Sequence, residues 1–83
     1  MTIPKITPPK GFTGLKLFYR HGEFKGWRAE KDGICWYIPV DAVGDGNWDT
    51  TSPRNWMTHP VWLSWLGITE RSTDGCEVRE VTE

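Results

Sequence analysis

The chain has 83 residues, six tryptophans and a formal net charge of −1. This length suits a single domain, and the near-neutral charge argues against indiscriminate binding to polyanions. Residues 1–10 hold no apolar signal-peptide core, and no apolar run approaches the ~18 residues of a membrane-spanning helix. We therefore expect a cytoplasmic protein whose Cys35 and Cys76 are reduced thiols, although the sequence alone leaves a single disulfide open.

Charge is distributed unevenly along the chain. Residues 1–40 carry seven Lys and Arg against three acidic residues, a net charge of +4. Residues 41–83 carry three Arg against eight acidic residues, a net charge of −5. The simpler interpretation is complementarity between the two halves inside the fold, and the alternative is a basic face and an acidic face that meet partners.

The first residues are rich in proline and lysine: Pro4, Lys5, Pro8, Pro9 and Lys10. Such a composition favours extended polyproline II backbone without a core of its own. We predict a flexible arm over residues 1–13 and a single compact α+β domain over residues 14–83.

Residues 14–40 predict a three-stranded antiparallel β-meander. Apolar residues alternate along its third strand, with the period of a half-buried strand. Asp32-Gly33 is a strong signal for a two-residue hairpin turn. That turn pairs Lys31 with Ile34, Ala29 with Trp36 and Trp27 with Ile38. For the first hairpin, we predict a three-residue loop over residues 21–23, which pairs Tyr19 with Lys25, Leu17 with Trp27 and Leu15 with Ala29.

This register divides the sheet into two faces of different composition. The predicted core face carries Leu15, Leu17, Trp27, Ala29, Ile34, Trp36 and Ile38. The predicted outer face carries Lys16, Phe18, Arg20, Arg28, Glu30, Cys35 and Tyr37. Two aromatic rings among three cations are more than a solvated face usually carries, so the outer face is a candidate binding surface.

Residues 41–51 predict a loop, and residues 52–67 predict two short helical segments. Ser52 and Pro53 are typical of a helix start, and Pro60 interrupts any helix that begins there. The second helix should begin at Pro60 and end at Gly67, a residue suited to a left-handed cap. Its stripe of Trp62, Trp65 and Leu66 should dock on the sheet, which places four tryptophans in the core: Trp27, Trp36, Trp62 and Trp65.

Residues 68–81 predict a C-terminal β-hairpin that turns at Asp74-Gly75. A two-residue loop there would pair Glu70 with Arg79 and Ile68 with Val81. The apolar content is low, which favours an edge element of the sheet.

The sequence contains no motif that predicts catalysis or a cofactor, and we expect neither. Asp45, Asn47 and Asp49 begin a calcium-loop pattern, but the later glycine and bidentate glutamate of that pattern are missing. A turn held by Asp and Asn side chains is the simpler interpretation. The two His and two Cys include no close pair of the kind that structural zinc sites contain, so we expect no metal site.

The leading functional hypothesis is a non-enzymatic protein-interaction module. Trp, Tyr and Arg dominate the energetics of protein interfaces, and residues 41–56 hold such a set. The predicted binding residues are Asp45, Trp48, Asp49, Arg54 and Trp56. The alternative for Trp48 and Trp56 is that both cap the core beneath the loop. Self-association through the same surface is also open.

Two other functions remain as alternatives. Single-stranded nucleic acid would bind the outer sheet face through stacking and phosphate contacts, with Lys16, Phe18, Arg20, Arg28 and Tyr37. Glycan binding would use exposed Trp side chains. Short, tryptophan-dense chains of this kind are typical of viral or mobile-element accessory proteins, which favours a host protein as the partner.

Overall fold

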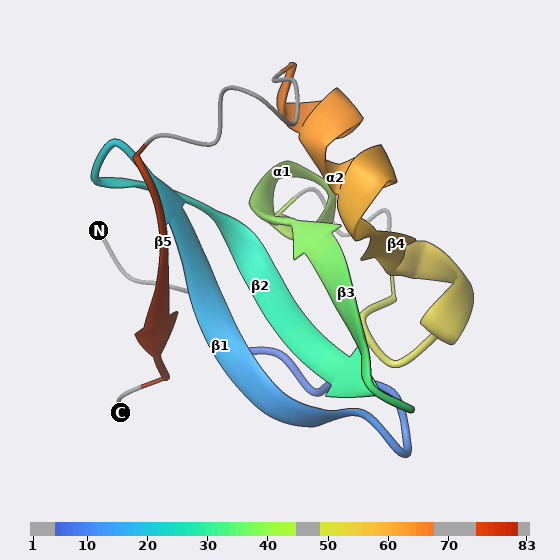
Figure 1. Cartoon of the computed structure of the whole chain (residues 1–83). Helices are drawn as coiled ribbons and strands as arrows, with labels where there is room; N and C mark the ends of the chain where they lie inside the picture. Colours follow the sequence, from blue (N-terminus) through green and yellow to red (C-terminus); the bar gives the residue numbers. More distant parts are fainter. Residues whose placement is uncertain (1–4, 45–48, 68–74, 82–83) are drawn as a thin grey trace.

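Five antiparallel strands form one sheet in the order β4-β3-β2-β1-β5. The structure is a computed structural model that describes residues 5–44, 49–67 and 75–81 (Figure 1). The strands are β1 (Thr13–Arg20), β2 (Glu23–Lys31), β3 (Ile34–Pro39), β4 (Met57–Thr58) and β5 (Cys76–Glu80). The helices are α1 (Val40–Gly44), the 3₁₀ helix η1 (Pro53–Asn55) and α2 (His59–Leu66). The α+β class predicted from the sequence is confirmed.

The predicted register between β2 and β3 is confirmed. Lys31 pairs with Ile34, Ala29 with Trp36 and Trp27 with Ile38. Asp32 and Gly33 both have positive φ, at 54° and 77°, as a tight two-residue hairpin turn requires. Local turn chemistry and the alternation of apolar residues therefore specify the same pairing here.

The first hairpin has the predicted pairing of Leu17 with Trp27, but with a shorter turn and a β-bulge. Tyr19 pairs with Phe24, and the turn contains only His21 and Gly22. The predicted three-residue loop is therefore wrong. A register shift between Phe18 and Tyr19 inserts one extra residue into β2, and this β-bulge restores the pairing that a longer loop would have produced.

The strand β5 pairs with β1. Within the described residues, it has no partner strand from the predicted C-terminal hairpin. Its register is regular, from Lys16 opposite Glu80 to Arg20 opposite Cys76. The predicted partner strand of the C-terminal hairpin lies outside the described residues. The prediction of an edge element is confirmed, because β5 ends the sheet.

One face of the sheet carries the larger hydrophobic cluster, at the predicted core face. Its buried members are Phe12, Leu17, Trp27, Ala29, Ile38 and Trp56. Ile6, Val40 and Val43 pack against it, so the residues before β1 and the short helix α1 both cover this face. The predicted arm thus contributes Ile6 and Phe12 to the core. The helix α1 forms from Val40, expected as the end of the third strand, and from residues 41–44, expected as a loop. Ile34 is 49% exposed because it sits at the end of β3, beside the turn.

The helix α2 covers the opposite face, which the sequence predicted as the outer surface. Phe18, Tyr37 and Trp62 are the buried members of this second cluster. Thr58 caps the start of α2, and Gly67 ends it with φ 75° and an N–H that donates to the Leu63 and Ser64 carbonyls. The predicted ends of the helix are confirmed to within one residue, whereas the face on which it docks is the reverse of the prediction.

Gly26 allows α2 to approach the sheet closely. A Cβ at this position would overlap the Ile38 carbonyl oxygen and would lie 2.9 Å from Cη2 of Trp62. Gly26 is buried in β2 beside the bulge. Glycine inside a strand typically marks such a bulge or a close approach, and here it marks both.

Replacing Gly26 with Ala should lower the free energy of unfolding by about 1–3 kcal/mol, the usual range for overpacking. Urea unfolding followed by tryptophan fluorescence measures the change. Gly14→Asn is the matched control, because its Cβ would meet open space and asparagine tolerates a positive φ. Equal stability of Gly26→Ala and the wild type would contradict the close approach of Trp62.

Candidate protein-interaction surface

Trp62 holds α2 on the sheet through a cluster of rings. It is fully buried and stacks on Tyr37, with ring centroids 5.5 Å apart and planes 10° apart. Phe18 meets the same indole edge to face at 5.4 Å. Aromatic pairs in these geometries add about 0.5–1.5 kcal/mol each beyond the area they bury. The orientation of α2 about its axis is therefore strongly determined.

This orientation turns Val61 and Trp65 outward. Val61 is 53% exposed and Trp65 is 49% exposed, and the two lie one helical turn apart on neighbouring positions of the helix surface. The prediction that Trp65 belongs to the core is wrong. At about 100° per residue, the buried stripe runs through Trp62, Leu63 and Leu66, and Trp65 falls at its margin.

The described residues of α2 and of its neighbour η1 carry little charge. The helix α2 contains no charged residue, and its neighbour η1 contributes one cation, Arg54. The exposed residues of η1 and α2 are Pro53, Arg54, His59, Pro60, Val61, Ser64 and Trp65. We call this set the α2 surface. Figure 1 shows η1 at the β4 end of α2.

The predicted binding loop is only partly within the described residues. Asp45 and Trp48 lie outside them. The Asp49 carboxylate accepts hydrogen bonds from Thr51, from its backbone N–H at 2.9 Å and its hydroxyl at 2.7 Å. These bonds hold the pKa of Asp49 below its usual value. Asn55 closes the turn by donating Nδ2 to the Asp49 carbonyl at 2.9 Å.

Trp56 belongs to the core and not to the exposed surface. It is 3% exposed, its ring lies 5.5 Å from that of Phe12, and its Nε1 donates to the Thr50 carbonyl at 2.8 Å. The prediction of an exposed anchor at Trp56 is corrected, and the alternative of a cap on the core describes this residue. Arg54, from the same predicted set, is exposed and lies within the α2 surface.

The basic and aromatic face required for nucleic-acid binding is covered. Phe18 is 4% exposed and Tyr37 is 6% exposed, because α2 packs over both. Stacking of bases needs open ring faces, so the arrangement assumed in that hypothesis is absent from the described structure.

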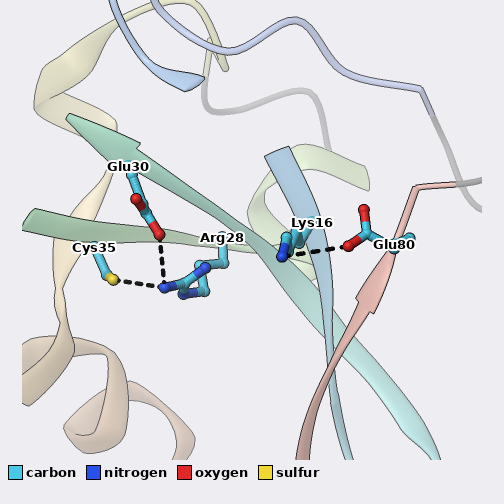
Figure 2. Close-up of polar contacts among 5 residues, drawn as sticks. All are labelled: Lys16, Arg28, Glu30, Cys35 and Glu80. Atoms are coloured by element: carbon cyan, nitrogen blue, oxygen red, sulfur yellow. Dashed lines mark hydrogen bonds and ion pairs between the residues drawn. The ribbon is translucent and has the colours of Figure 1, made fainter. Parts of the chain in front are cut away.

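Two of the three cations of that face, Lys16 and Arg28, are also matched by acidic residues. Nζ of Lys16 lies 3.3 Å from Glu80, and Arg28 donates to Glu30 at 3.0 Å and to the Cys35 sulfur at 2.8 Å (Figure 2). Arg20 is half-buried at the end of β1. The Lys16–Glu80 pair, between β1 and β5, joins the basic and acidic halves of the chain, whereas Arg28 and Glu30 both lie on β2.

Burial and neighbours shift the pKa values of two groups beneath α2. Burial raises the pKa of Tyr37, and the neighbouring Arg28 guanidinium only partly opposes this. Burial lowers the pKa of Arg28, but Tyr37 and Cys35 outweigh it and raise the pKa overall. Arg28 therefore stays charged, and Tyr37 stays protonated beyond its ordinary range.

The described residues contain no group of three or more His, Cys, Asp or Glu that would hold a metal ion. Cys35 and Cys76 are both free thiols. No helix within the described ranges is long and apolar enough to cross a membrane.

Comparison with known proteins found no matching family model and no significant match among curated proteins or solved structures. The chemistry of the α2 surface is therefore the guide to function. Sequence reasoning missed Val61 as a surface residue, although one signal was present: a helix of eight residues without a charge has no obvious solvated face.

Trp56→Ala should destabilise the fold by about 3–5 kcal/mol, as truncation of a buried tryptophan does. Arg54→Ala should change stability by less than about 0.5 kcal/mol, because its side chain is exposed. Chemical denaturation of both variants measures the difference. A Trp56→Ala protein as stable as the wild type would contradict the burial of Trp56.

Tyr37 should ionise above the usual tyrosine pKa of about 10. Its folded pKa exceeds its unfolded pKa, so its contribution to stability is fully present below pH ~10 and is lost as pH rises through the folded value. Tyrosinate absorbance during an alkaline titration measures this step. Tyr37→Phe should remove the absorbance change at the highest pH, and Tyr19→Phe should retain it. The reverse result would contradict the assignment of this change to Tyr37.

Proposed function

We propose that this protein is a non-enzymatic protein-binding module whose contact region is the α2 surface. The observation that carries the proposal is the exposure of Val61 and Trp65, each about half exposed, on a helix without charged residues. A solvated helix normally presents charged side chains outward. An outward face of this composition is explained by a partner that covers it.

The composition of the α2 surface matches the centre of a protein interface. Interface cores are depleted in charged residues and enriched in aromatic residues and Arg, and Trp and Arg are prominent among energetic hot spots. Trp65 supplies a large half-exposed ring and Arg54 supplies the cation. We infer a partner with an apolar groove for Val61 and Trp65 and an acidic group for Arg54.

The α2 surface is also rigidly presented, which supports affinity. Trp62 and Leu63 on the inner side of the helix are 0% and 2% exposed, so little conformational freedom remains to be lost on binding. We place the interaction in the cytoplasm, where the free thiols of Cys35 and Cys76 would persist in a reducing environment. A host protein as partner of a viral or mobile-element accessory protein stays part of this proposal.

The double variant Val61→Ser/Trp65→Ser should lose affinity for the partner by about 10–100-fold, because two interface anchors are removed. The partner is first identified by affinity capture from host lysate with and without nuclease. Binding of the purified partner is then measured by isothermal titration calorimetry.

Ile34→Ser is the matched control, because Ile34 is 49% exposed but lies at the β2–β3 turn, away from α2. It should bind as the wild type does. Full affinity in the double variant, with folding confirmed by near-ultraviolet circular dichroism, would overturn the proposal. Capture that disappears with nuclease would replace it with nucleic-acid binding.

A further inference from the structure

Among the described residues, β5 is the outermost strand at one edge of the sheet. It has β1 on one side, and no other described residue pairs with its outer side. The helix α1 packs on β2 and β3, and α2 packs on β3 and β4. Figure 1 accordingly shows α2 towards the β4 edge and β5 at the opposite edge. Neither helix covers the outer edge of β5.

The β1–β5 ladder determines which backbone groups of β5 face outward. The His21 N–H donates to the Gly75 carbonyl at 2.8 Å, in continuation of the β1–β5 register. Hydrogen-bonded pairs alternate along an antiparallel ladder, so the backbone groups of Glu77 and Arg79 face β1. Those that face outward belong to Cys76, Val78 and Glu80.

This edge carries charged side chains at Glu77, Arg79 and Glu80, which is one of the features that protect edge strands from pairing, but it has no proline, lysine or bulge. Its register with β1 is uninterrupted. Val78 is 42% exposed and Val81 is 46% exposed. The outer edge of β5 therefore remains competent to accept another strand.

We propose that this edge pairs antiparallel with β5 of a second copy of the chain, about a twofold axis at Val78. Directly opposite residues of such a pair share one face of the sheet. With Val78 opposite Val78 of the second copy, Glu77 of each chain lies opposite Arg79 of the other. Glu77 and Arg79 of one chain already pair with each other at 3.0 Å, and the twofold axis would join the two pairs into one network in which each charge also meets an opposite charge of the second copy.

The backbone supports the same register. Val78 would form a hydrogen-bonded pair with its counterpart, and Cys76 would do so with Glu80 of the second copy, because all three direct their backbone groups outward. The predicted intramolecular hairpin would use the same edge but would set Glu77 opposite Ser72. The second copy thus matches both Glu77 and Arg79, whereas the hairpin matches only Arg79.

Sedimentation equilibrium of the full chain tests the pairing. The wild type should form a reversible dimer that weakens as salt concentration rises. Glu77→Arg and Arg79→Glu should each weaken self-association at least tenfold, because each places like charges opposite one another. An equimolar mixture of these two variants should form a heterodimer, and the combined variant Glu77→Arg/Arg79→Glu should recover self-association.

Val78→Pro tests the backbone contribution separately from charge. The Val78 N–H faces outward, so proline removes a donor to the second copy without removing one to β1. The variant should be monomeric while its near-ultraviolet circular dichroism stays that of the wild type. Val61→Ser/Trp65→Ser should still dimerise, which separates this pairing from the α2 surface.

A wild type that stays monomeric at the highest soluble concentration would overturn the proposal, as would occupation of the edge by the chain's own residues 68–72. A dimer that persists unchanged in Val78→Pro and Arg79→Glu would show a different interface and would also overturn it. Recovery of self-association in the combined variant is the result that distinguishes this register, because heterodimer formation alone would follow from any register that brings the two oppositely charged strands together.

Discussion

The packing of Trp62 against Gly26 is the constraint on which the rest of the structure depends. The indole occupies the space that a side chain at Gly26 would need, and it is enclosed by Phe18 and Tyr37. In a chain this short, a large share of the surface remains exposed on folding, so each buried ring has a large effect on stability. A side chain at position 26 would overlap the Ile38 carbonyl and crowd Trp62, so it would strain both the β2–β3 pairing and the second cluster.

The same contact decides the chemistry of both sides of α2. Because Trp62 fixes the rotation of the helix, Leu63 and Leu66 turn inward with it, while Val61 and Trp65 are left at the surface. Covering Phe18 and Tyr37 also places Arg28 in a half-buried position, where Glu30 and Cys35 meet its guanidinium. Thus one packing interaction both removes a basic aromatic face and creates an apolar one.

The two proposed contact regions lie at opposite edges of the sheet. The α2 surface lies towards β4, and the open strand β5 ends the other side (Figure 1). Pairing of two copies through β5 would leave both α2 surfaces free, and a dimer would present two of them at once. Such an arrangement raises the apparent affinity for a partner that is itself repeated or oligomeric.

The sequence by itself determined the features that depend on neighbouring residues. The Asp32-Gly33 turn, the β2–β3 register and the cap at Gly67 follow from local backbone preferences and from the alternation of apolar residues. The His21-Gly22 turn was missed because a two-residue loop without a bulge would set Lys16 opposite Trp27 and scatter the apolar residues. The bulge next to the turn restored the expected pairing at Leu17.

Only the tertiary structure decided which face of the sheet α2 covers. The alternation of apolar residues divides the strands into two faces. It cannot say which face the helix covers when both carry aromatic rings, as they do here with Trp27 on one face and Tyr37 on the other. The larger face is covered by Phe12, α1 and Trp56, which are assembled from distant parts of the chain, and this leaves α2 for the other face. The burial of Trp56 and the exposure of Trp65 follow from that choice, because each depends on contacts between residues far apart in sequence.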